Sequence, residues 1–98
     1  MPFAIEFSPD AREHLRSMKK RDQQIIVDAI AHHRTHRPDL PTAHRKPLAD
    51  NPVAPWELRV GDFRVFYDVN RDGQVVAVVA VGQKSHNRLR IGGEEIEL

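Results

Sequence analysis

Residues 56–69 read WELRVGDFRVFYDV, and this stretch carries the clearest structural signal in the chain. Apolar and polar side chains alternate over 56–60 and again over 63–69, which is the pattern of a half-buried β-strand. Gly61 and Asp62 separate the two runs, and the glycine supplies the positive φ that a two-residue turn needs. The stretch therefore predicts a β-hairpin.

The register of this hairpin divides its side chains between two faces. With a two-residue turn, Val60 lies opposite Phe63 and Arg59 opposite Arg64. One face is expected to meet the helices and carries Trp56, Leu58, Val60, Phe63, Val65, Tyr67 and Val69. The open face carries Glu57, Arg59, Arg64, Phe66 and Asp68. Two arginines opposed across a ladder repel each other, so the open face is a candidate surface for binding phosphate.

Further strands are predicted on both sides of the hairpin. Residues 75–82 (VVAVVAVG) are apolar throughout, which is typical of an interior strand covered on both faces, and a turn at 70–73 precedes them. Residues 3–7 alternate and predict an N-terminal strand. The tail, 89–98, predicts a small last hairpin around its two glycines.

Two helices are predicted between the N-terminal strand and the hairpin. The first begins at 8–10, where a serine N-cap, a proline and an acid follow one another. The second is expected to start with Asp22 as its cap and to end at Pro38. Its expected buried side consists of Ile25, Ile26, Ala29, Ile30 and His33.

The order of these elements predicts a two-layer α+β fold, β-α-α-β-β-β, with a mainly antiparallel sheet and a helical hairpin on one face. A long loop is expected before the hairpin, because five of the seven prolines fall within eighteen residues. These are Pro38, Pro41, Pro47, Pro52 and Pro55.

Length and composition narrow the function classes. With 98 residues, 40% of them hydrophobic, the chain is expected to form a single domain, 1–98. The absence of cysteine excludes disulfides, thiol catalysis and thiolate metal sites. No bilayer-spanning run or secretion signal is present, so a cytoplasmic protein is expected. His32 and His36 have i, i+4 spacing, but no acid nearby completes a site, so neither a metal nor another cofactor is expected.

Charge is segregated along a chain whose net charge is only +1. Residues 11–46 hold nine basic side chains against four acidic ones. A second basic cluster, Lys84, His86, Arg88 and Arg90, follows the last long strand. Antiparallel pairing is expected to place this cluster beside the 61–62 turn, while Arg45 and Lys46 enter the hairpin from the loop. Such patches create a local field that the net charge hides.

The open face is therefore expected to gather several cations, the imidazole of His86, and Phe66 as a surface on which a base could stack. Cleavage of RNA without a metal needs a base for the 2′-hydroxyl proton, cations for the phosphate, and an acid for the leaving oxygen. These residues provide such groups. The alternative is that the arginines only solubilise an exposed sheet face and pair with neighbouring acids.

The stretch 56–69, with VVAVGQK at 78–84, resembles the core of RelE/ParE-type toxins of bacterial type II toxin–antitoxin systems. The preceding strand and two helices also match, so the resemblance covers nearly the whole chain. In this family the RelE branch cleaves mRNA in the ribosomal decoding site without a metal, whereas the ParE branch poisons DNA gyrase. The resemblance implies a sheet-plus-helical-hairpin fold and one of these two activities.

The resemblance also assigns roles to single residues. Arg64 matches the arginine that contacts the scissile phosphate in RelE-like nucleases, and Lys84 matches a phosphate-directed position after the last strand's glycine. Two family features are missing here, the lysines of the second strand and a tyrosine near the C-terminus. The proton transfers of a nuclease would then fall to Lys46, His86 or Glu57.

Three interpretations follow from the residues and the resemblance. The first is a ribosome-dependent, metal-independent mRNA endonuclease, with Arg59, Arg45, Arg88, Arg90 and Phe66 as further RNA contacts. The second is a non-catalytic gyrase inhibitor whose basic helices carry the contact. The third is an inactive relative. Ribosome and mRNA are the expected partners of the first, and a flexible, acidic antitoxin is expected in any case, because basic patches attract such segments.

Overall fold

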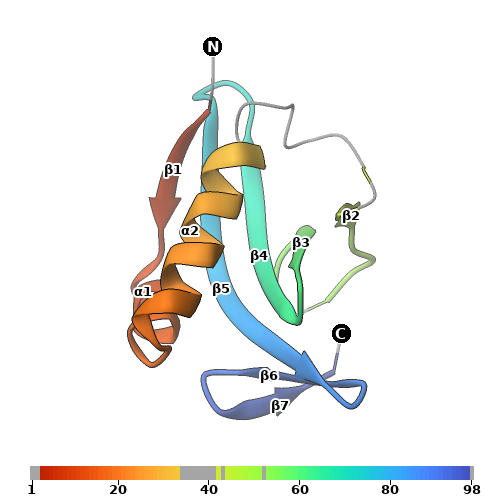
Figure 1. The fold of residues 1–98 in the computed structure, drawn as a ribbon. Helices are drawn as coiled ribbons and strands as arrows, with labels where there is room; N and C mark the ends of the chain where they lie inside the picture. Colours follow the sequence, from red (N-terminus) through yellow and green to blue (C-terminus); the bar gives the residue numbers. More distant parts are fainter. Residues whose placement is uncertain (1–2, 34–41, 43, 52, 98) are drawn as a thin grey trace.

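The computed structural model describes residues 3–33, 42, 44–51 and 53–97 (Figure 1). The chain begins with β1 (Ala4–Phe7), α1 (Pro9–Arg16) and α2 (Lys20–His33). The later strands are β2 (Arg45–Pro47), β3 (Trp56–Val60), β4 (Phe63–Asn70), β5 (Val75–Ser85), β6 (Arg88–Ile91) and β7 (Glu94–Ile96). The predicted α+β class, with both helices on one face of a mainly antiparallel sheet, is confirmed.

The sheet is built around β5. Its strand order is β2-β3-β4-β5-β6-β7, and β1 pairs in parallel with β5. β4 occupies one edge of β5, so β1 and β6 share the other edge, with Phe7 opposite Val78 and Ile91 opposite Gly82. β5 bends along its length, and the β6–β7 hairpin lies across its end (Figure 1). A Cβ on Gly82 would lie 2.6 Å from the Arg90 carbonyl oxygen, so only glycine allows this close pairing.

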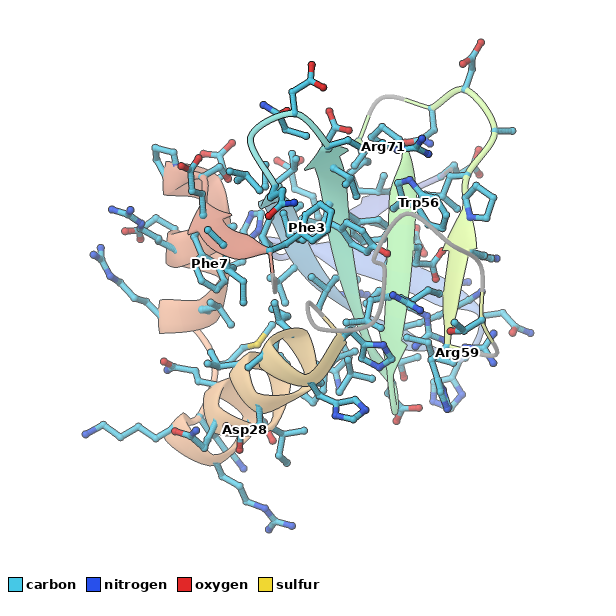
Figure 2. All side chains as sticks on the ribbon, turned by 90° about the horizontal axis from the view of Figure 1, so that it is seen from above. Phe3, Phe7, Asp28, Trp56, Arg59 and Arg71 are labelled. Atoms are coloured by element: carbon cyan, nitrogen blue, oxygen red, sulfur yellow. The ribbon has the colours of Figure 1, made fainter. Side chains whose placement is uncertain are left out.

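The predicted hairpin and its register are confirmed. Arg59 pairs with Arg64 and Val60 with Phe63, and Gly61 adopts a φ of +58° in the turn. The predicted helix-facing side chains form the main core with the helices. Its buried members are Ala11, Ile26, Ile30, Leu58, Val65, Tyr67, Val76, Val78 and Val81. In Figure 2, Trp56 and Arg59 both project from β3, and Asp28 lies on the side of α2 that faces away from the sheet.

The second helix differs from its prediction at its start and on its buried face. α2 begins at Lys20, and the Gln23 amide donates to the Lys19 carbonyl at 3.0 Å, so Asp22 lies in the first turn rather than at the cap. There its charge still favours the positive end of the helix dipole. Ile25 is 43% exposed, because the stripe that meets the sheet is only wide enough for Ile26 and Ile30. The predicted end at Pro38 lies outside the described residues.

α1 closes a gap in the sheet. Between the last pair of β1 and the first pair of β6, the outer edge of β5 has no neighbouring strand. The Ser8 hydroxyl donates to the Val79 carbonyl at 2.8 Å, and the Val81 amide donates to Nδ1 of His14 at 3.2 Å. Ser8 also accepts from the Ala11 amide at 3.0 Å, which confirms the predicted N-cap. One serine therefore starts the helix and holds it against β5.

We expect Ser8→Ala to lower the free energy of unfolding by about 1–2 kcal/mol, because both a cap and a sheet-edge partner are lost. Ser17→Ala is the matched control, since its exposed hydroxyl donates only to the His14 carbonyl, and its effect should stay within about 0.5 kcal/mol. Urea unfolding of the two variants measures the difference. Equal losses would contradict the dual role of Ser8.

The face opposite the helices carries a second, smaller core. Ala54, Phe66, Ala80 and Leu89 are buried there, and Leu48, Val53, Val79, Ile91 and Ile96 pack against them. The loop before β3 and the β6–β7 hairpin therefore cover part of this face. The prediction that 75–82 is covered on both faces is confirmed. The open face expected for the hairpin is partly covered, because the loop and the tail contribute apolar side chains of their own.

Candidate functional site

A cleft of about 550 Å³ lies on the sheet face opposite the helices. Its charged and amide lining includes Lys46, Asp50, Asn51, Glu57, Arg64, Lys84, Asn87 and Glu97. Its apolar lining includes Leu48, Ala49, Leu89 and Ile96. The cleft therefore combines cationic groups with an aliphatic surface.

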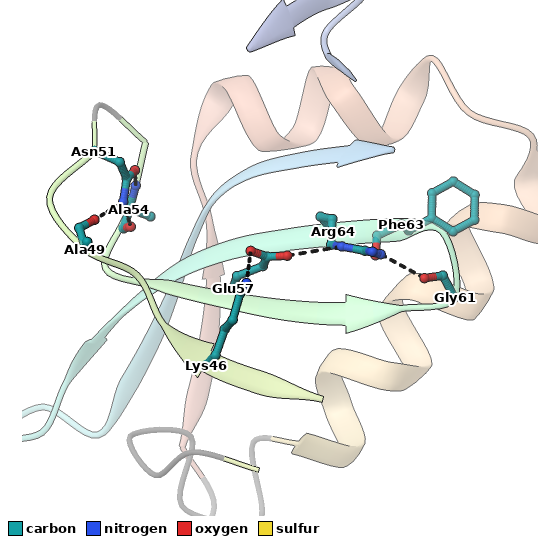
Figure 3. Close-up of polar contacts among 8 residues, drawn as sticks. All are labelled: Lys46, Ala49, Asn51, Ala54, Glu57, Gly61, Phe63 and Arg64. Atoms are coloured by element: carbon teal, nitrogen blue, oxygen red, sulfur yellow. Dashed lines mark hydrogen bonds and ion pairs between the residues drawn. The ribbon is translucent and has the colours of Figure 1, made fainter. Parts of the chain in front are cut away.

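A nearly buried ion-pair network lies in the cleft (Figure 3). Nε of Arg64 lies 3.1 Å from Oε1 of Glu57, and Nζ of Lys46 lies 3.9 Å from Oε2 of the same carboxylate. The Arg64 and Glu57 side chains are 11% and 10% exposed, whereas that of Lys46 is 61% exposed. The carboxylate therefore has a cation on each oxygen, and one of these cations is open to solvent.

The guanidinium group of Arg64 is fixed by hydrogen bonds on one side, and its other side is available to a ligand. Its Nη1 donates to the carbonyl oxygens of Gly61 and Phe63 at 2.8 and 2.9 Å. Nη2 makes no hydrogen bond to any residue in the described part of the chain. A planar guanidinium fixed on one side can still offer the N–H groups of the other to an oxyanion.

Strand register brings these groups together. Lys46 pairs with Glu57 across β2 and β3, and Arg64 lies diagonally from Glu57 on β4. Between the pairs Phe66–Ala80 and Tyr67–Val78, Val79 has no partner on β4. This bulge shifts the phase of β5, so that residues after it point to the face opposite the one they would otherwise occupy. The bulge therefore turns Lys84 into the cleft instead of toward the helices.

Asn51 shapes the loop that borders the cleft. Its Nδ2 donates to the carbonyls of Ala49 and Ala54 at 2.7 and 3.0 Å. Its Oδ1 accepts from the amides of Val53 and Ala54 at 2.8 and 3.1 Å. The amide is thus fully occupied in folding the loop (Figure 3).

The structure unites three of the four candidate catalytic residues. Lys46, Arg64 and Lys84 line one cleft. His86 does not line it: this residue is exposed in the β5–β6 turn, with a φ of 51°. Arg59 is exposed beside the network, where it borders a small hollow that Lys46 and Glu57 also line.

Four further expectations about the open face were wrong. Phe66 is 0% exposed beneath the loop and tail, so it offers no stacking surface. Arg45 is 3% exposed, and its backbone N and its Nε both donate to the Thr42 hydroxyl. Arg88 and Arg90 alternate with residues that pack into the second core, so they project from the other face of β6. Arg88 pairs with Glu95 at 3.5 Å.

Sequence reasoning undervalued two groups that line the cleft. Glu57 was expected on the open face, but its central place became visible only with β2, whose three residues lie in a proline-rich stretch. Asn87 was not singled out, because a lone amide after a basic strand end carries no motif. The one sequence signal for Asn87 was its position three residues after Lys84, in the expected turn that follows the strand.

Among the described residues, no group of three or more His, Asp or Glu side chains is arranged to hold a metal ion. His36 lies outside those residues. None of the described helices has the length and apolar character needed to cross a bilayer.

The fold matches solved toxin–antitoxin proteins. The RelBE2 complex from Mycobacterium tuberculosis contains a chain 23% identical, with a TM-score of 0.70 over 86% of this chain and 100% of that one. An archaeal RelE–RelB complex from Pyrococcus horikoshii gives 17% identity and a TM-score of 0.68, over 88% of this chain and 99% of that one. At these identities the likeness is one of fold. No curated protein matches the chain.

A family model gives the more specific result. The model described as "ParE toxin of type II toxin-antitoxin system, parDE" matches residues 5–88. This range runs from β1 to β6 and contains every charged residue of the ion-pair network. The chain therefore belongs to the ParE toxin family of type II toxin–antitoxin systems, within the RelE/ParE superfamily.

Proposed function

We propose that this toxin is a metal-independent endoribonuclease that cuts ribosome-bound mRNA and that a cognate antitoxin neutralises it. The observation that supports this activity is the cleft lined by Lys46, Arg64 and Lys84, in which Arg64 and Lys46 contact the nearly buried carboxylate of Glu57. Asp50 and Glu97 line the same cleft, so its three cations balance three carboxylates, and the N–H groups of Arg64 and the Lys84 ammonium, rather than a net positive charge, favour a phosphate here.

The three network residues and Lys84 each have a role in transesterification. Arg64 and Lys84 hold the non-bridging oxygens of the phosphate and stabilise the charge that develops on them. Glu57 accepts the proton of the 2′-hydroxyl, and the 2′-oxygen forms a bond to phosphorus. The bond between phosphorus and the 5′-oxygen breaks, and that oxygen takes a proton from the Lys46 ammonium. The products are a 2′,3′-cyclic phosphate and a free 5′-hydroxyl.

For the proton transfers, this assignment keeps Glu57 and Lys46 from the three residues that the sequence left open and drops His86. His86 lies outside the cleft lining, whereas Glu57 lies between Arg64 and Lys46. A carboxylate oxygen can accept the proton of a hydroxyl group bound beside it. Lys46 is the more exposed member of the network, so its ammonium can approach a leaving group.

Gyrase inhibition is the second candidate. The family model that matches residues 5–88 is described as a ParE toxin, and the superfamily's ParE branch poisons gyrase. In that case the contact would use the basic helices rather than the cleft. Exposed cations on them include Arg12, Arg16, Lys20 and Arg21.

We expect purified toxin to cut mRNA on translating ribosomes and to leave 5′-hydroxyl ends, because the 5′-oxygen is the leaving group. The measurement maps 5′ ends with and without prior phosphorylation by a polynucleotide kinase, with naked RNA and antitoxin-bound toxin as controls. Gyrase-linked DNA breaks, scored in parallel with supercoiled plasmid, test the second candidate. DNA breaks without mRNA cleavage would overturn the endonuclease proposal.

The expected antitoxin contact also follows from charge. Both similar solved structures are toxin–antitoxin complexes. Exposed cations lie at the cleft, where they are Lys46 and Lys84, and also on the two helices. A flexible acidic segment wrapped around the protein would neutralise both.

A further inference from the structure

Asn87 lines the cleft without serving the fold. Its side chain is exposed and makes no hydrogen bond or ion pair with any residue in the described ranges. Asn51, the other amide at the cleft, has all its bonds satisfied within its loop. The Asn51 amide therefore stabilises the loop that borders the site, whereas the Asn87 amide is available to contact a ligand.

The backbone fixes the position of Asn87. Ser85 and Arg88 pair across β5 and β6, and the two residues between them have φ values of 51° and 63°. This is a tight hairpin turn with two left-handed residues, and glycine fits the second position at least cost. Asparagine tolerates this conformation and adds an amide that glycine lacks. The turn therefore holds a donor and an acceptor beside Lys84.

The remaining lining suits a base. Leu48 and Ile96 are partly exposed and present aliphatic surface in the same cleft as the cations, which Asp50 and Glu97 line as well. Because Phe66 is buried, this surface takes the place of the expected aromatic one. A nucleotide needs cations for its phosphate, apolar contact for the face of its base, and hydrogen bonds for the edge. The cleft offers all three within about 550 Å³.

We infer that Asn87 is a specificity-determining residue that reads the base of the bound nucleotide and favours adenine over guanine. The amide can donate to N7 and accept from the N6 amino group of adenine at the same time. Guanine presents acceptors at both N7 and O6, so the amide oxygen would face an acceptor. This inference rests on the proposed function, because only an RNA-binding cleft has a base to read.

The test maps cleavage on translated messages that differ only by adenine or guanine at each position around a cut. Wild-type toxin should cut adenine messages roughly tenfold faster at one fixed position, the discrimination typical of a two-bond amide contact. Asn87→Gly keeps the turn and removes the amide, so it should cut both messages alike. A third message carries 7-deaza-adenine, which lacks the N7 acceptor, and wild-type toxin should cut it no faster than the guanine message.

The outcomes separate this inference from the function on which it rests. Cleavage without an adenine preference, or a preference that Asn87→Gly retains, would overturn the role of Asn87 and leave the endonuclease standing. A preference for a pyrimidine at that position would do the same. Absence of any cleavage by wild-type toxin would overturn both. Thermal unfolding of Asn87→Gly confirms that the turn is intact.

Discussion

Arg64→Lys should abolish growth arrest and lower mRNA cleavage at least 100-fold while the protein stays folded. Lysine keeps a positive charge beside Glu57 but has no planar group with which to bind a phosphate through Nη2. Loss of one preorganised donor to a developing oxyanion typically costs a factor of about 100 to 1000 in rate. The effect should therefore fall on catalysis.

The variant also loses two structural hydrogen bonds, so stability must be measured beside activity. Nη1 of Arg64 bonds to the carbonyls of Gly61 and Phe63, at an exposed turn where water can replace it. We expect a loss of about 1–2 kcal/mol in the free energy of unfolding. Arg16→Lys is the control, since Arg16 pairs with Glu13 on α1 at the other face of the sheet. Undiminished growth arrest by folded Arg64→Lys would exclude the cleft as the toxic site.

The hairpin was predictable because its alternation is nearly complete. In residues 56–69 apolar and polar side chains alternate except at Phe66, and Gly61 fixes the turn, so register and faces follow. Residues 75–81 carry no such information. When every side chain is apolar, the sequence does not show which residues point to which face of the sheet, so the bulge at Val79 could not be located.

That bulge determines whether Lys84 belongs to the site. Without it, Lys84 would share the face of Val76 and Val78, which pack toward the helices. Proximity to the 61–62 turn was correctly predicted, and the Lys84 amide donates to the Asp62 carbonyl at 2.8 Å. The same argument wrongly placed Arg90 on the open face, because the position of a residue along a strand does not determine the face to which its side chain points. The exposure of Phe66 was wrongly predicted for another reason. This side chain is buried by a loop and a tail that are distant in sequence, and such tertiary contacts are not visible in the local pattern.

Glu57→Gln should change RNA binding and RNA cleavage in opposite directions. Glutamine keeps the size of the side chain and can still accept a hydrogen bond from Arg64, but it removes the negative charge between Arg64 and Lys46. RNA should bind as tightly or more tightly, because the cations no longer share a carboxylate with the phosphate. Cleavage should fall by a factor of about 100 or more, the usual contribution of a general base.

The control is Glu13→Gln, which removes a carboxylate paired with Arg16 on the exposed face of α1. It should alter neither binding nor cleavage. Binding is measured with a non-cleavable message that carries 2′-deoxy nucleotides, so that affinity is separated from the chemical step. Melting temperatures of both variants report whether the network is needed for folding.

The sign of the cleavage change separates three roles for Glu57. A proton acceptor gives slower cleavage with unimpaired binding. A carboxylate that only occupies the phosphate position would give tighter binding and faster cleavage, because its removal frees Arg64. A purely structural residue would lower the melting temperature and weaken both measurements together. Because Glu57 is the one carboxylate that contacts both Arg64 and Lys46 in the described chain, cleavage by Glu57→Gln at the wild-type rate would reject it as the base.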